Sequence, residues 1–155
     1  MPKEVIHRTA SDNKYLHKDF HGALSVGLDY LQSHYGDESV RDYLRQFARS
    51  FYAPLAEEVR CRGLVALAEH FEKVYEDESG RVRISLSDDE LRIDVEACPA
   101  VTHMRQHGYP VAPLFHETTR TVNEAICEDT PFAAELIDYD PETGRGTQRF
   151  YRSQP

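Results

Sequence analysis

Long hydrophobic runs are missing from this sequence. No apolar stretch approaches the roughly 20 residues that a membrane-spanning helix requires, so we expect no membrane partner. The first residues, MPKEVIHRTASDNKYL, lack the apolar core of a secretory signal, which favours a cytoplasmic location. Internal repeats and low-complexity linkers are also absent. The 155 residues are therefore expected to form a single domain over 1–155, with 1–10 as a loose N-terminal arm.

Basic charge is in short supply. The chain has 27 acidic residues against 18 lysines and arginines, a formal net charge of −9, and its arginines are scattered among acids. A nucleic-acid-binding protein usually has a basic face, because contacts with phosphates supply most of its affinity. We therefore expect no nucleic-acid partner.

Cysteine is scarce too, with only Cys61, Cys98 and Cys127. The odd number and wide spacing argue against a disulfide framework, and there is no Cys-x-x-Cys pair to indicate a structural zinc site. Histidine, by contrast, is frequent. Eight histidines in a chain of this length slightly favour metal binding or acid–base chemistry.

The first half of the chain has helical periodicity. Apolar residues recur at spacings of three and four over 13–35, which predicts a first helix with one buried stripe. A second helix is expected to begin at Asp37 or Ser39. A third begins at Pro54, a residue that is favoured in the first turn of a helix, and its apolar stripe continues to Tyr75.

In the second half the apolar residues alternate with polar ones, which is typical of half-buried strands. Strands are expected over 81–86, 91–97, 132–139 and 146–152, with short helices over 99–108 and 114–127. Strands that follow a run of helices favour an α+β fold. We predict an N-terminal three-helix layer packed on an antiparallel sheet made of two strand pairs, with the two short helices between them.

Cys98 is the first candidate for chemistry. It ends an expected strand and precedes Pro99, which favours the first helical position, so Cys98 should be the N-cap. Free backbone N–H groups and the helix dipole at an N-cap favour a thiolate, the form that acts as a nucleophile or metal ligand. The alternative is a small cysteine buried at a strand end, a common position for free cysteine.

A second candidate is the start of the helix expected over 114–127. His116, Arg120 and Asn123 are spaced four and three apart, so they share one helix face. Such a face could transfer a proton through His116, hold a substrate carboxylate through Arg120, and bind a carbonyl or oxyanion through Asn123. Glu117 lies three residues before Arg120 and could pair with it as part of a substrate-binding set. The alternative is an ordinary solvated helix face.

His17 and His21 are four apart on the first helix, a spacing that can chelate a divalent metal such as zinc or iron. The glutamate of an HExxH motif is absent, so further ligands would come from elsewhere, with Cys98 and His116 as candidates. The alternative is that both histidines lie at the edge of the core with water or backbone partners.

Three motifs follow one another in the C-terminal half: a Cys-Pro at the end of a hairpin, an aromatic–His helix start, and a closing aromatic–arginine strand. They are Cys98-Pro99, Phe115-His116 and Arg149-Phe150-Tyr151-Arg152. Over residues 80–152 this order resembles the L-2-amino-thiazoline-4-carboxylic acid hydrolase-like family, whose members open a cyclic sulfur-containing amidine by adding water.

The resemblance implies that Cys98 matches the family's Cys-Pro motif and shares a pocket with residue 116. The chain departs from the family at two positions. His116 stands where a second cysteine is common, and residues 146–148 contain no cysteine where the family often has one. The resemblance therefore implies a Cys/His pocket rather than the complete cysteine set.

Two functions are compatible with these features. The first is a hydrolase-like or lyase-like enzyme that acts on a C–N bond of a carboxylated cyclic small molecule, with Cys98 and His116 as catalytic residues. The alternative is a non-catalytic module that binds a small ligand or metal for a partner enzyme. The second expected helix carries aromatic residues on more than one face, which also predicts a homo-oligomer.

Overall fold

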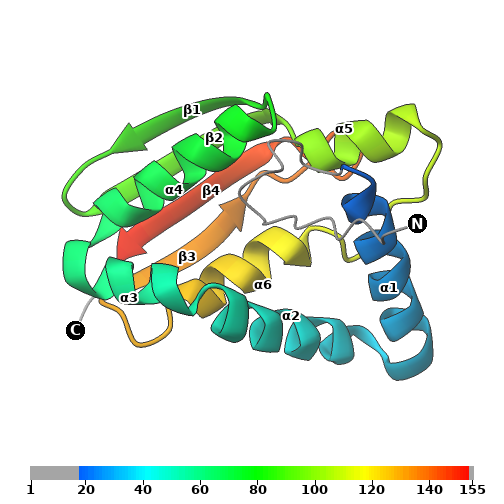
Figure 1. The fold of residues 1–155 in the computed structure, drawn as a ribbon, viewed down its shortest axis with the longest axis horizontal. Helices are drawn as coiled ribbons and strands as arrows, with labels where there is room; N and C mark the ends of the chain where they lie inside the picture. The colour runs from blue at the N-terminus through cyan, green and yellow to red at the C-terminus, as the bar shows by residue number, and fades with distance from the viewer. Residues whose placement is uncertain (1–17, 154–155) are drawn as a thin grey trace, which may run out of the picture.

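The computed structural model describes residues 18–153, within which six helices and four strands follow one another (Figure 1). The helices are α1 (Asp19–Tyr35), α2 (Asp37–Phe51), α3 (Ala53–Arg62), α4 (Leu64–Asp77), α5 (Pro99–Gln106) and α6 (Glu117–Ile126). The strands are β1 (Arg81–Leu86), β2 (Glu90–Ala97), β3 (Phe132–Ile137) and β4 (Gly146–Arg152). The expected α+β class is confirmed.

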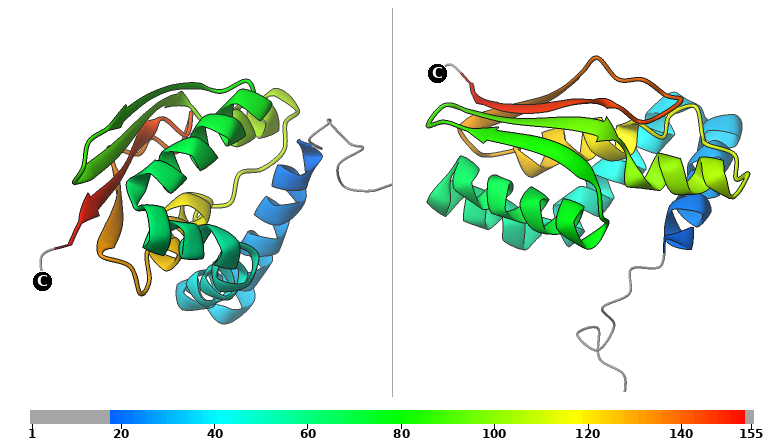
Figure 2. Two further views of the ribbon diagram at one scale, coloured as in Figure 1. Left: turned by 60° about the vertical axis from the view of Figure 1, so that its left-hand side comes forward. Right: turned by 90° about the horizontal axis from the view of Figure 1, so that it is seen from above.

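The four strands form one antiparallel sheet in the order β1-β2-β4-β3, so two hairpins join along β2 and β4. The alternation of apolar and polar residues along β2 gives the strand one buried face and one exposed face, as expected. Leu91, Ile93 and Val95 are buried on one face, while Arg92 and Asp94 point to the other. Figure 2 shows that the helices gather on one face of the sheet and leave the opposite face open.

Two helices, α4 and α6, pack directly on the strands, and α2 packs on α6 as a further layer. The N-terminal helix α1 contacts α2 and α5 rather than the sheet. Its apolar stripe is only partly covered, since Leu28 is buried but Phe20 and Tyr35 are more than half exposed. None of the helices within residues 18–153 combines the length and apolar character needed to cross a membrane.

The expected third helix is two helices, because the chain breaks at Gly63. This residue has φ +72°, a left-handed conformation that glycine adopts without the steric cost of a Cβ. Its N–H donates to the carbonyl of Val59 at 2.8 Å, which closes α3 in a typical C-terminal turn. The break separates α3 from α4 and allows α4 to lie along the sheet.

Candidate functional site

A cavity of about 250 Å³ lies between the helices and the sheet, bounded by α1, α2, α4, α6, the start of α5 and one residue of β4. Aromatic side chains make up much of its wall. They are Phe20, Tyr43, Phe47, Tyr52, Phe71, Tyr75 and Phe115. A concave, mostly apolar site with a few polar groups is the usual form of a small-molecule site.

Helical spacing places these side chains around the cavity. Phe71 and Tyr75 of α4 and Glu78, its C-cap, are four and three residues apart, so they project on the same side of the helix. On α2, Tyr43 and Phe47 are four apart and form the facing wall. The cavity therefore depends on how α2 and α4 are held over the sheet.

A chain of three hydrogen-bonded side chains, the buried Asn123 and Gln148 and the partly buried Tyr75, forms the polar part of the wall on the sheet side. Asn123 of α6 donates from Nδ2 to Oε1 of Gln148 at 2.8 Å. Gln148, on the inward face of β4, donates from Nε2 to the hydroxyl of Tyr75 at 2.8 Å. Burial, with the negative charge of Glu78 adding to it, raises the pKa of Tyr75. The tyrosine therefore stays neutral and its hydroxyl hydrogen is available to donate.

Cys98 is the N-cap of α5, as expected, and its side chain lines the cavity. Its backbone is extended, with φ −71° and ψ 123°, and its N–H donates to the carbonyl of Thr143 at 2.9 Å. Burial raises the pKa of the thiol, and this outweighs the backbone N–H groups of Val101 and Ala100, which lower it. The neutral thiol is therefore favoured, against the thiolate expected from the helix start.

His21 also lines the cavity, from the first turns of α1. Its Nε2 lies 3.3 Å from Oε1 of Glu78, which follows the C-terminus of α4. This contact joins α1 to α4 across 57 residues of sequence. The other histidine of the expected metal pair, His17, lies outside the described residues.

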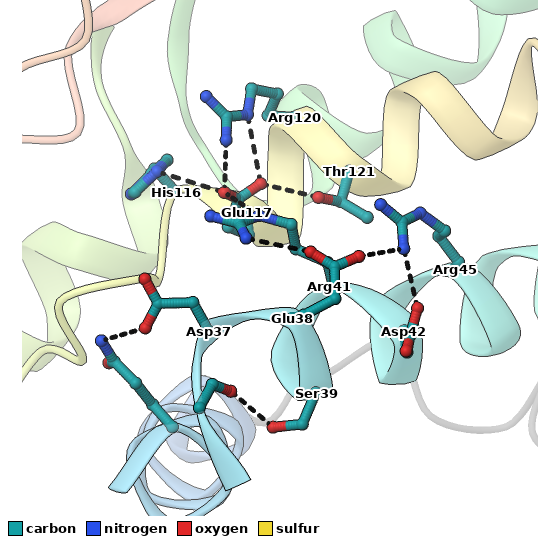
Figure 3. A network of polar contacts seen from close by, with 12 residues as sticks. Asp37, Glu38, Ser39, Arg41, Asp42, Arg45, His116, Glu117, Arg120 and Thr121 are labelled. Carbon is teal, nitrogen blue, oxygen red and sulfur yellow. Dashed lines mark hydrogen bonds and ion pairs between the residues drawn. The ribbon is translucent and has the colours of Figure 1, made fainter.

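The predicted face of α6 is divided between two environments. Asn123 lines the cavity, but His116 and Arg120 do not. Instead they gather around Glu117, whose carboxylate is fully buried between α2 and α6 (Figure 3). Arg120 Nη2 lies 2.5 Å from Glu117 Oε1, and Nε of Arg41 on α2 lies 3.1 Å from the same oxygen.

Glu117 is charged in this setting. Burial alone would raise the pKa of its carboxyl, but hydrogen bonds from Thr121, Arg120 and Arg41 lower it overall. Thr121 contributes the closest contact to the second oxygen, Oε2, at 2.6 Å. Arg120 is thus committed to an internal partner rather than presented to the cavity. The buried Glu117 carboxylate also differs from the alternative expectation of an ordinary solvated helix face.

The cavity wall has an uneven charge. Among the described residues that line it, Glu78 is the one carboxylate, and there is no lysine or arginine. Two histidines, His21 and His70, complete its titratable nitrogen groups. Burial lowers the pKa of His70, which packs edge-on to the Tyr52 ring with 5.7 Å between ring centroids. His70 is therefore neutral at pH 7.

Of the residues singled out from the sequence, His21, Cys98 and Asn123 come together around one cavity. Tyr75, Glu78 and Gln148 were missed. Gln148 had a signal, because it lies within residues 146–148, where the resemblance expects a cysteine. Glu78 had none, since an acidic residue after a helix is an ordinary surface feature.

The metal site stays a prediction. Within residues 18–153 no three His, Cys, Asp or Glu side chains come together in a way that could hold a metal ion. Of the four proposed ligands, His21 and Cys98 line the cavity and His116 does not. The zinc or iron hypothesis would need another ligand beside His21 and Cys98.

Comparisons with protein-family models and with curated proteins gave no significant match to this chain. The resemblance to the thiazoline-carboxylate hydrolase-like family therefore stays a prediction based on its short motifs.

Proposed function

We propose that this protein binds a small organic molecule with an aromatic or apolar ring in the cavity between α1, α2, α4 and α6. The volume of about 250 Å³ lies just below the ~300–1,000 Å³ typical of small-molecule pockets, which favours a compact ligand. Burial of the ligand's apolar surface against the aromatic side chains of the wall would supply most of the binding free energy.

The observation that carries the proposal is the hydrogen-bonded chain from the buried Asn123 and Gln148 to the partly buried Tyr75, within aromatic walls. Buried polar groups are costly unless they are hydrogen-bonded, and this chain satisfies its two buried members. Among residues 18–153 the Tyr75 hydroxyl hydrogen has no acceptor, so it can donate to a ligand. Cooperative polarisation along such a chain strengthens its terminal donor. A ligand with a hydrogen-bond acceptor would be oriented by it.

The test compares ligand binding by two variants of α4. Val74 lines the cavity, and Val65 lies exposed on the same helix outside it. We expect Val74→Phe to fill part of the cavity and to weaken binding of benzyl alcohol, followed by NMR titration, at least tenfold. Val65→Phe should leave binding unchanged. Equal binding by wild type and Val74→Phe would place any bound ligand elsewhere and reject the proposal.

The second candidate is a catalytic form of the same function, in which the Cys98 sulfur bonds to a carbon of a bound cyclic substrate, the C–N bond at that carbon breaks, and the departing nitrogen takes the thiol proton. Water would then cleave the new C–S bond, release the product and restore the thiol. The observation that favours it is that Cys98 and the His21–Glu78 pair line the same cavity. It requires a base within hydrogen-bond reach of the thiol. Within residues 18–153, His21 rather than His116 shares the cavity with Cys98. Alkylation of Cys98 by iodoacetamide at pH 7 as fast as that of the exposed Cys61 would favour the catalytic candidate.

A further inference from the structure

The electrostatics of the cavity narrow the class of ligand. Glu78 follows the last residue of α4, and its backbone N–H donates to the carbonyl of Val74 at 3.0 Å. The C-terminal end of a helix carries a partial negative charge from its unpaired carbonyls. Carboxylate and helix end therefore add their negative potential at the same edge of the cavity.

The Glu78 carboxylate has capacity for a further partner. Its side chain is 14% exposed, and its one hydrogen bond to a side chain within residues 18–153 is the contact with His21. An ionised carboxylate can accept about four hydrogen bonds. One imidazole therefore leaves room for an ammonium group on the side that faces the cavity.

The charge of Glu78 acts across the cavity. Burial is the main reason that the pKa values of Tyr52, Tyr75 and Cys98 are raised, and the Glu78 charge raises all three further. Tyr52 lies between α2 and α3, Tyr75 lies on α4, and Cys98 is the N-cap of α5, so the three groups lie on different parts of the wall. The negative charge of Glu78 is therefore directed at several parts of the cavity wall.

The aromatic wall suits a cation as well. The faces of tyrosine and phenylalanine rings are electron-rich and attract an organic cation within about 6 Å of the ring centre. Tyr52, Phe71 and Tyr75 line the same cavity as Glu78. A protonated amine on a ring-bearing body could therefore place its charge near Glu78 and its ring among these side chains.

The cavity wall offers an anionic ligand few favourable electrostatic contacts. No lysine or arginine lines the cavity among the described residues, and His70 is held neutral by burial. Arg120, the residue expected to hold a substrate carboxylate, is paired with the buried Glu117 instead. His21 is already in contact with Glu78, so a carboxylate in this cavity would approach Glu78 and the end of α4 with no other basic partner among the described lining residues.

We propose that the ligand of this cavity is a small organic cation, a protonated amine on an aromatic or apolar body, whose charge lies beside Glu78. This inference rests on the proposed small-molecule function and specifies its ligand class.

The test uses three compounds of nearly equal size: benzylamine, which is a cation at pH 7, benzyl alcohol, which is neutral, and benzoate, which is an anion. Binding to the full chain is measured by NMR titration at constant ionic strength. We expect benzylamine to bind about tenfold more tightly than benzyl alcohol, a factor equivalent to about 1.4 kcal/mol. Benzoate should bind more weakly than the alcohol.

The matched variants are Glu78→Gln and Glu76→Gln, because Glu76 is an exposed acid two residues earlier. Glu78→Gln should remove the tenfold preference for benzylamine and keep the affinity for benzyl alcohol. Glu76→Gln should change neither. If the Glu78→Gln variant is unfolded at the temperature of the titration, the inference is tested on the wild type alone. The affinities must then fall in the order benzylamine, benzyl alcohol, benzoate.

The outcomes separate the two proposals. If benzyl alcohol or benzoate binds as tightly as benzylamine, and Val74→Phe abolishes that binding, the cation inference is overturned and the small-molecule function stands. An unchanged preference for benzylamine in folded Glu78→Gln also overturns the inference. If none of the three compounds binds in a way that Val74→Phe weakens, the proposed function itself is rejected.

Discussion

Gly144 lies so close to Cys98 that a Cβ at residue 144 would collide with the Cβ of the cysteine. The glycine has φ +69° and closes the turn between β3 and β4, which is joined to the start of α5 by the Cys98 N–H···O=C Thr143 bond of 2.9 Å. The turn thus holds the cysteine in place at the cavity wall. Sequence spacing gave no indication of this contact, because the two residues are 46 positions apart.

Gly144→Ala should be strongly destabilising. The new methyl group meets Cys98 and Val101 and also requires an unfavourable left-handed conformation. We expect a loss of about 3 kcal/mol in the free energy of unfolding, measured by urea denaturation. Gly108→Ala is the control, because Gly108 has φ +67° and open space around it. That variant should lose only the conformational cost of about 1 kcal/mol. Equal losses would mean that the close approach to Cys98 is not important.

Cys98 should react slowly with iodoacetamide at pH 7, because burial raises the pKa of its thiol. Its alkylation is expected to be slower than that of the exposed Cys61 and to accelerate as the pH rises above 9, the ordinary thiol value. Mass spectrometry of digested protein distinguishes the sites. Cys127 is the internal control, since burial raises the pKa of its thiol to about 12. Alkylation of Cys98 at pH 7 as fast as that of Cys61 would support the nucleophile hypothesis instead.

Local pattern predicted the α+β class, the two hairpins and the N-cap position of Cys98, because these depend on alternation and on Pro99. It did not predict which neighbours cover each helix face. On α6, Glu117 faces Arg41 of α2 while Asn123 faces Gln148 of β4. Spacing along one helix cannot distinguish these environments, since both partners are remote in sequence.

The residues of the cavity wall also have partners that are remote in sequence and that local spacing does not predict. His21 was recognised from its spacing to His17, but its partner in the structure is Glu78, 57 residues away. The break at Gly63 was missed for a related reason. A glycine within an apolar helical pattern is tolerated at a cost of about 1 kcal/mol, so the pattern alone does not show that the chain turns there.

Tyr75→Phe should destabilise the protein by about 1–2 kcal/mol, because it leaves the Gln148 Nε2 group without its acceptor in a buried position. The free energy of unfolding from urea denaturation measures the loss. Tyr52→Phe is a matched control, since the Tyr52 hydroxyl has no hydrogen-bond partner among residues 18–153 and its loss should cost less than about 0.5 kcal/mol. Similar losses in both variants would contradict the proposed importance of the Asn123–Gln148–Tyr75 chain.

Glu117→Gln should cost about 2–3 kcal/mol at pH 7, because Arg41 and Arg120 would lose their shared anionic partner. The pKa of Glu117 is lower in the folded protein than its ordinary value of 4.5. The stabilisation is therefore fully present above pH 4.5 and lost as the pH falls through the lower folded value. The difference in stability between wild type and variant should shrink over that acidic range. Glu124→Gln, at an exposed position of α6, should show no such difference.

The predicted homo-oligomer is tested at Phe51, whose side chain is 66% exposed and stacks on Phe47 with 5.2 Å between ring centroids. Tyr43 and Phe47 of α2 are exposed as well, and a group of exposed aromatic residues on one helix supports the predicted contact with another subunit. We expect multi-angle light scattering to give a mass above the 17.8 kDa of one chain, and Phe51→Lys to reduce it to that value. Phe51 is not among the residues that line the cavity, so benzyl alcohol binding should persist in the variant. A wild-type mass of one chain at working concentrations would reject the oligomer and leave the cavity proposals untouched.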